Sequence, residues 1–287
     1  MLKLYRLRHE NIVRLVQTGS DSVNCYIWTD LCLGGELWSN CAKFGEPELR
    51  SMAYFSQILS AVEYMHRMGI VHRDIKAENV FLSGDCGSIA KLGDFGSSVD
   101  IFNPTMRTFS NTRGSFFHYV GTPNFMSPES INNTENDQIS DIWSLGCLLY
   151  QILIGIPPFV AGSEYLVFLR VTALDLQFPT LGVSDSACNL IRTILQPIRE
   201  KRPSLSEIRK HPFCSNSPKL VPPLSQTDCA LKRLAQAGCP LVGESFDLNK
   251  IHMIETVRDW ERRSAPGTGT EMLNHLNLPQ LASSGIT

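Results

Sequence analysis

The sequence predicts an α+β fold in which short strands come first and a larger helical region follows. Two apolar runs near the N-terminus, residues 12–16 and 26–28, are short and rich in β-branched or aromatic residues, as strands are. From Gly34 onward, apolar residues recur mainly at spacings of three and four, the period of an amphipathic helix. A proline-rich linker, SNSPKLVPPLSQ, begins at residue 215 and ends this pattern. We therefore expect a helical region over residues 34–214 behind a small N-terminal sheet.

The first long helix is predicted between Pro47 and Gly69. Proline favours the first helical turn, and glycine favours the left-handed position that ends a helix. An apolar stripe with helical spacing runs between them, made of Met52, Phe55, Ile58, Leu59, Val62 and Met65. This helix leads directly into residues 72–79, so we expect it to position that segment.

Serines mark the expected starts of the later helices, because a serine hydroxyl can accept a hydrogen bond from the free amides of a first turn. These serines are Ser140, Ser163, Ser184 and Ser204, and Ser204 forms a capping-box pattern with Glu207. The helix at 184–195 has a predicted buried face made of Leu190, Ile191, Ile194 and Leu195. The last helical turn is expected near residues 211–213.

Composition excludes several classes of protein. The 287 residues are 43% hydrophobic, which is enough for a sizeable core, and the formal net charge of −2 gives no electrostatic case for nucleic-acid binding. The most apolar segment, residues 142–159, is too short for a membrane span and is expected to be a buried helix. Nine cysteines without a C-x-x-C pair indicate reduced thiols in a cytoplasmic protein, and the N-terminus has no signal-peptide pattern.

The most specific feature is the segment HRDIKAENVFLSGDCGSIAKLGDFG at residues 72–96. It brings together His72, Arg73, Asp74, Lys76 and Asn79, and Asp94-Phe95-Gly96 follows. Each of these residues alone is more often a turn residue, a surface charge or a core histidine. The complete register of the first motif, with the second motif behind it, favours a catalytic site.

This segment resembles the catalytic and metal-binding loops of eukaryotic protein kinases. The resemblance implies a protein-kinase-like fold, mainly the helical large lobe with a partial small-lobe sheet. Asp74 would accept the proton of the substrate hydroxyl, and Lys76 would contact the transferring phosphate. Asn79 and Asp94 would bind Mg²⁺ through oxygen atoms, with ATP as the phosphate donor.

Further residues resemble the serine/threonine class. Lys76 and the pair Gly121-Thr122 are typical of it, and Thr122 would line the acceptor pocket beside Asp74 and Lys76. The resemblance also implies structural roles for Glu129 paired with Arg202, for Asp141, which would hold the catalytic-loop backbone, and for Arg73. Ser127 stands where the family usually has alanine.

The run at 140–168 resembles the phosphoinositide-dependent protein kinases of the AGC group, most distinctively in AGSEYLVF, and the resemblance extends over about residues 7–213. Residues 25–38 resemble the fifth strand and hinge, which implies a set of nucleotide-binding residues. Thr29 would be the gatekeeper, Asp30, Leu31 and Cys32 would offer backbone groups to adenine, Glu36 would reach the ribose, and Phe81 would lie under the base. Cys32 and Phe81 fit plain core packing equally well.

The resemblance implies a self-phosphorylated serine before the segment VGT, and Ser115 occupies a similar position, with about three extra residues intervening. A phosphate there could pair with Arg73 and order the loop. An ordinary polar loop serine is the alternative. Segment 94–129 resembles an activation segment for protein substrates, which argues against a small-molecule kinase.

The chain contains no G-x-G-x-x-G segment, and HENIV at residues 9–13 resembles the passage from helix C of the small lobe into its fourth strand. We therefore expect a fragment with a small-lobe remnant at 1–33, the large lobe at 34–214 and a partly disordered tail at 215–287. The predicted function is that of a non-specific serine/threonine protein kinase acting on protein substrates, other kinases among them by resemblance, without nucleic acid or a membrane segment. The alternative is a catalytically impaired interaction module.

Overall fold

The computed structural model describes residues 2–42, 45–84, 87–102, 121–132, 137–179 and 182–223. These residues lie within one compact unit, Met1–Leu224. Within them the helices, in chain order, are α1 (Leu2–Arg6), α2 (Leu37–Cys41), α3 (Glu48–Arg67), α4 (Pro128–Ile131), α5 (Gln138–Ile154), α6 (Glu164–Thr172), α7 (Asp185–Ile194), α8 (Leu205–Lys210) and α9 (Pro212–Ser215). The 3-10 turns are η1 (Ala77–Asn79), η4 (Pro123–Phe125) and η5 (Arg199–Lys201). The predicted α+β class is confirmed.

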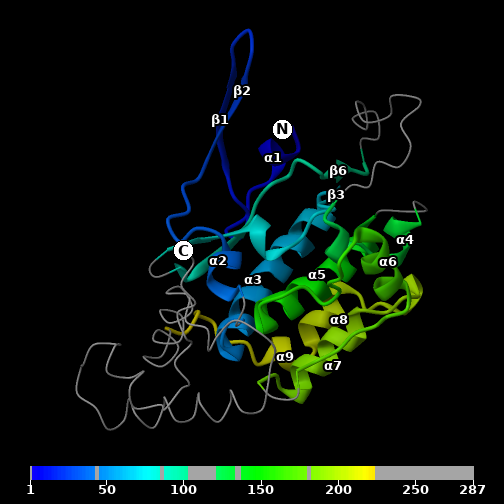
Figure 1. The fold of residues 1–287 in the computed structure, drawn as a ribbon. Helices are drawn as coiled ribbons and strands as arrows, with labels where there is room; N and C mark the ends of the chain where they lie inside the picture. The colour runs from blue at the N-terminus through cyan, green and yellow to red at the C-terminus, as the bar shows by residue number, and fades with distance from the viewer. Residues whose placement is uncertain are drawn as a thin grey trace, which may run out of the picture. The chain divides into compact units, whose positions relative to one another are not determined.

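The strands form three small antiparallel sheets. They pair β1 (Leu15–Ser20) with β2 (Cys25–Thr29), β3 (Ile70–Val71) with β6 (Val99–Asp100), and β4 (Val80–Ser83) with β5 (Ile89–Leu92). Figure 1 shows the β1–β2 hairpin extending away from the helices, and every side chain of β2 is exposed. The predicted run at 12–16 is only partly strand, because β1 begins at Leu15. The Val13 amide donates instead to the Leu92 carbonyl, at 2.9 Å.

Helix α3 carries the predicted apolar stripe into the core. All six stripe residues are buried, and the helix packs against α5 and β5 (Figure 1). Gly69 has a φ of 75°, the left-handed conformation expected after a helix end. Pro47 is the residue before the first turn and not within it, since its ψ of 140° is extended.

Helix α5 forms the second part of the core, with nearly all of its 17 residues buried. The prediction that Ser140 caps this helix is wrong. Asp137 is the cap, because its backbone is extended and its carboxylate accepts from the Ile139 amide at 2.9 Å. Ser140 lies within the first turn of the helix and donates to Glu129 at 3.0 Å.

The other predicted caps are confirmed. Ser163 caps α6, Ser184 caps α7, and Ser204 forms a full capping box with Glu207 at the start of α8. None of the helices in the described ranges is long and apolar enough to cross a membrane. Ser115 and residues 224–287 lie outside the described residues, so the predictions made for them stay predictions.

Candidate active site

Asp141 anchors the loop that follows β3. It is a fully buried residue in the first turn of α5. Its carboxylate accepts hydrogen bonds from the backbone amides of His72 and Arg73, each at 2.8 Å. His66 Nε2, from the end of α3, lies 2.8 Å from the same carboxylate. Arg73 has a φ of 70°, a conformation that costs a non-glycine residue energy, so these bonds stabilise an otherwise unfavourable turn.

His72 joins this loop to the segment that carries Asp94. Its Nε2 donates to the Gly93 carbonyl at 2.9 Å, and its Nδ1 accepts from the Asp74 amide at 3.3 Å. Both contacts require a neutral ring protonated on Nε2. Burial lowers the pKa of His72, more than the charges of the neighbouring carboxylates raise it. The ring also meets Phe95 edge-on, with centroids 4.9 Å apart.

Asp74 is the centre of a four-residue cluster. Its Oδ1 accepts from the Thr122 hydroxyl at 2.9 Å, and its Oδ2 accepts from Asn79 Nδ2 at 2.8 Å. The Lys76 ammonium lies 3.0 Å from Oδ2 and donates to the Thr122 hydroxyl at 2.5 Å. The structure therefore brings together the four residues predicted to be catalytic, although Thr122 is far from the others in sequence.

Burial alone would raise the pKa of Asp74. The hydrogen bond and charge of Lys76, together with the bonds from Thr122 and Asn79, outweigh that effect and hold the pKa below its ordinary value. Asp74 is therefore a carboxylate at neutral pH, which is the state required to accept a proton.

The approach of Thr122 to this cluster depends on the residue before it. Gly121 has a φ of 115°, and a Cβ built there would lie 2.8 Å from the Arg73 carbonyl oxygen. A side chain at position 121 would therefore push the turn away from the catalytic loop.

The predicted metal ligands offer hard oxygen donors. Asn79 Nδ2 donates to the Asp74 carboxylate and to the Asp74 carbonyl, at 2.8 and 2.7 Å, so its amide oxygen Oδ1 is the atom that would face a metal ion. Asp94 is exposed, and one of its oxygens accepts from the Gly96 amide at 3.1 Å. The Gly93 amide donates to the Asn79 carbonyl at 2.8 Å and so fixes the two segments side by side.

Such a donor set fits Mg²⁺, which takes oxygen ligands and is usually bound by one or two side chains plus substrate phosphates. Among the residues that the structure describes, no three His, Cys, Asp or Glu side chains gather into a metal-binding group.

The predicted hinge lies against β4. The Gly34 amide donates to the Leu82 carbonyl at 2.9 Å, and the Leu82 amide donates to the Gly35 carbonyl at 2.8 Å. A Cβ on Gly34 would come within 2.7 Å of Leu82 Cβ, so only glycine fits this approach. The backbones of Glu36 and Phe81 form an isolated antiparallel β-bridge. The residue expected to contact the ribose therefore lies beside the residue expected to contact the base.

The predicted nucleotide-binding side chains differ in exposure. Thr29 and Glu36 are exposed, whereas Cys32 and Phe81 are half-buried. The carboxylate of Asp30 accepts from Arg14 at 3.2 Å and from Lys91 at 3.1 Å. The Asp30 amide donates to the Arg14 carbonyl at 3.0 Å, and the Asp30 carbonyl accepts from the Thr29 hydroxyl at 3.4 Å.

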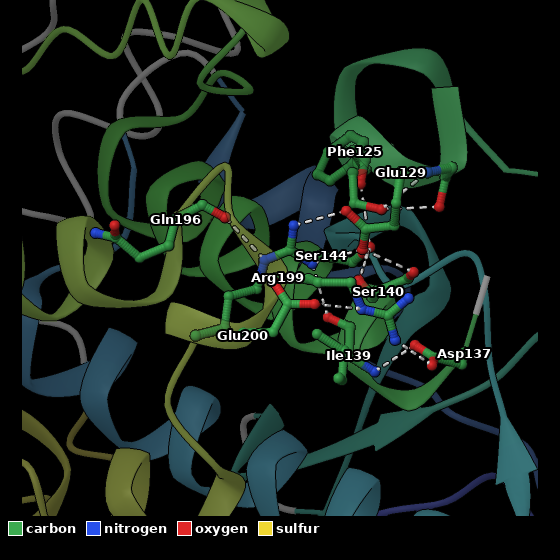
Figure 2. A network of polar contacts seen from close by, with 12 residues as sticks. Phe125, Glu129, Asp137, Ile139, Ser140, Ser144, Gln196, Arg199 and Glu200 are labelled. Carbon is green, nitrogen blue, oxygen red and sulfur yellow. Dashed lines mark hydrogen bonds and ion pairs between the residues drawn. The ribbon is translucent and has the colours of Figure 1, made fainter. Parts of the chain in front are cut away.

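Glu129 and Arg202 form the centre of a buried polar network; Figure 2 shows Glu129 within it, beside Ser140. The two pair in bidentate fashion at 2.6 and 2.7 Å, and both are buried. Arg202 also donates to the carbonyls of Gln196 and Ile139 and stacks 5.0 Å from the Trp143 ring. Burial would raise the pKa of Glu129, but its bonds with Arg202 outweigh that effect and lower it.

Sequence reasoning missed one positioning residue, Gln151. Its buried side-chain oxygen accepts from the Ala77 amide at 2.9 Å, and its amide nitrogen donates to Glu78 at 3.2 Å. Through these bonds α5 fixes η1, the turn that carries Asn79. A polar residue inside the apolar run 142–159 was the available signal.

Residues 1–214 match the family model described as "Protein kinase domain". The chain is 36% identical over 212 residues to the serine/threonine-protein kinase PDK1 of Cryptococcus neoformans, covering 74% of this chain and 17% of that protein. It is 35% identical over 243 residues to the 3-phosphoinositide-dependent protein kinase 1 of Arabidopsis thaliana, covering 78% and 49%. With the human protein of that name the identity is 30% over 276 residues, covering 88% and 48%. The matched region spans at most about half of these relatives.

Proposed function

This chain belongs to the protein kinase family, and we propose that it transfers the γ-phosphate of ATP to serine and threonine hydroxyls of protein substrates. The observation that carries the proposal is the cluster of Asp74, Lys76, Asn79 and Thr122, in which an ionised carboxylate is held beside a lysine and a hydroxyl. This arrangement suits a reaction in which the enzyme mainly positions groups and neutralises charge.

In the proposed reaction Asp74 accepts the proton of the attacking hydroxyl, and Thr122 helps to orient the carboxylate. Lys76 stabilises the charge on the transferring phosphate. Asn79 and Asp94 would hold Mg²⁺, which when bound would neutralise charge on the nucleotide phosphates. The backbone at Asp30, Leu31 and Cys32 would bind adenine, with Thr29, Glu36 and Phe81 around it.

The 287 residues contain no G-x-G-x-x-G segment. We therefore propose that they supply the Mg²⁺ ligands and the groups that receive the substrate hydroxyl. In the family template a glycine-rich loop covers the phosphates and a strand-three lysine pairs with them. We accordingly propose weak ATP binding by these residues on their own. If the chain folds but transfers no phosphate, the result would favour the alternative, a catalytically impaired interaction module.

The substrates and location are proposed on kinship. The curated relatives are named as phosphoinositide-dependent or serine/threonine kinases, which supports protein substrates, and other kinases are proposed among them. A cytoplasmic location is proposed as well. Phosphorylation of Ser115 stays a prediction that phosphopeptide mapping can test, and an unmodified Ser115 in active material would contradict it.

The test is Mg²⁺-dependent transfer of labelled phosphate from ATP to a serine peptide. We expect transfer by the wild-type protein and a loss of at least about a hundredfold in Asp74→Asn, which keeps the shape of the side chain but removes the base. Asp175→Asn changes an aspartate outside the site that also pairs with a cation, Arg170, and whose side chain is 42% exposed, so it is the matched control. Equal rates for wild type and Asp74→Asn would contradict the proposal, because the signal would then not come from this site.

A further inference from the structure

Turn η4 follows Thr122 directly, so the position of this turn sets the position of the Thr122 hydroxyl. Two backbone hydrogen bonds between residues three positions apart close it. The Phe125 amide donates to the Thr122 carbonyl at 2.9 Å, and the Met126 amide donates to the Pro123 carbonyl at 3.3 Å. These bonds shape the turn but do not attach it to the rest of the protein. Its attachment must come from other contacts.

Side chains provide two such contacts. Asn124 Nδ2 donates to the Phe159 carbonyl at 2.6 Å, which fixes the turn to the segment after α5. The Ser144 hydroxyl, on α5, lies 3.1 Å from the Phe125 carbonyl (Figure 2). The same hydroxyl lies 3.3 Å from the Ser140 carbonyl, the usual acceptor for a helical serine. The closer acceptor belongs to the turn.

A small cavity lies between the turn and α5, which makes these contacts important. Thr122, Phe125 and Met126 line it from the turn, Ser140 and Ser144 line it from α5, and Asp74 reaches it from the catalytic loop. Close packing is what normally fixes a buried segment, and a cavity removes those contacts on one side. Phe125 and Met126 are buried and hold the turn by packing on their own side. On the side that faces the cavity, its placement depends on hydrogen bonds.

We propose that Asn124 and Ser144 are positioning residues for the hydroxyl acceptor. They fix η4 across the cavity and thereby keep Thr122 within hydrogen-bond distance of Asp74 and Lys76. Neither residue touches the reacting groups. The inference rests on the proposed kinase function for its kinetic consequence, whereas its structural consequence can be measured without activity.

The first experiment measures hydrogen exchange of the Phe125 and Met126 amides in the full chain. Ser144→Ala and Asn124→Asp each remove a tether with little change of size, and we expect exchange at both amides to rise about fivefold or more. Ser51→Ala is the matched control, because Ser51 is another buried helical serine that donates to carbonyls, at 3.1 and 3.3 Å, but far from the turn in the fold. Ser144→Thr keeps the hydroxyl that donates to the Phe125 carbonyl, so it should restore protection.

The second experiment measures phosphate transfer to a serine peptide. Loss of either tether should raise the KM for the peptide about fivefold while the KM for ATP is unchanged. A general loss of folded protein would lower the maximal rate and leave both KM values as they were. Exchange rates in Ser144→Ala and Asn124→Asp equal to those in Ser51→Ala would overturn the inference. A wild-type protein that transfers no phosphate would instead refute the proposed function, and the exchange measurement would still decide the tethering.

Discussion

Replacing Glu129 with glutamine should strongly destabilise the helical region, because it breaks a buried ion pair from one side. The Arg202 side chain is fully buried, with 0% exposure, and Glu129 is 8% exposed. The two bidentate bonds of 2.6 and 2.7 Å would be lost in their charged form, and the Arg202 charge would remain in the interior. Removing one partner of a buried pair typically costs about 3–5 kcal/mol. Arg202 keeps carbonyl partners and the Trp143 ring, so we expect the lower end, about 3 kcal/mol.

The assay is urea unfolding followed by circular dichroism, with the free energy of unfolding taken by linear extrapolation. Glu63→Gln is the matched control, because Glu63 also binds an arginine, Arg209, in bidentate fashion, at 2.7–3.1 Å. That pair is 27% and 41% exposed, so its loss should cost at most about 1 kcal/mol. Equal losses in the two variants would refute the argument that burial decides the value of the pair.

Acid conditions give the same pair a second test. Because the pKa of Glu129 is lowered in the folded protein, its contribution to stability is present above the unfolded pKa, near 4.5. That contribution is lost as the pH falls through the folded value. The Glu129→Gln variant should therefore lose less stability than wild type between about pH 4.5 and lower pH, and parallel profiles would contradict the assigned direction.

Three further predictions concern the site. Lys76→Met should raise the pKa of Asp74 towards or above 3.8, because burial then meets less opposition, and carbon NMR titration of the carboxyl should detect the shift; an unchanged pKa would contradict the role of Lys76. Gly34→Ala should cost about 1–3 kcal/mol of unfolding free energy by forcing a Cβ against Leu82, whereas Gly162→Ala, where nothing lies within 4 Å, should be near neutral in the same melt. His72 is buried with a lowered pKa, so its neutral form stabilises the fold above pH 6.5, and this contribution falls as the pH drops below that value. The free energy of unfolding should therefore differ less between pH 5 and pH 7 in His72→Gln than in wild type. An equal difference in the two proteins would refute this.

Local signals predicted local structure well. The capping box at Ser204 and Glu207, the caps at Ser163 and Ser184, and the left-handed Gly69 all involve residues within about one turn of each other. Interactions over such short spans depend on side-chain type and backbone conformation, which the sequence states directly. The same holds for the motif at residues 72–96, whose order alone indicated the family.

Ser140 shows where local signals fail. Serine is a good cap, but so is aspartate, and Asp137 stands three residues earlier. The fold brings Glu129 next to Ser140, and the Ser140 hydroxyl donates to the Glu129 carboxylate instead of capping the helix. Gln151 is a similar case, since its acceptor role depends on η1 lying against the middle of α5.

The sequence by itself determined the family, the long helices with most of their caps, and the identity of the acidic, amide and basic side chains of the candidate site, but not the short strands β3 to β6 within the helical region. Only the tertiary structure decided how Thr122 meets Asp74, how Asp141 reaches the amides of His72 and Arg73, and how an asparagine and a serine hold turn η4. These contacts join residues 19 to 69 positions apart, and their distances follow from how α3 and α5 pack. A residue pattern specifies which groups can bond, whereas packing of the core selects which of them are close enough to do so.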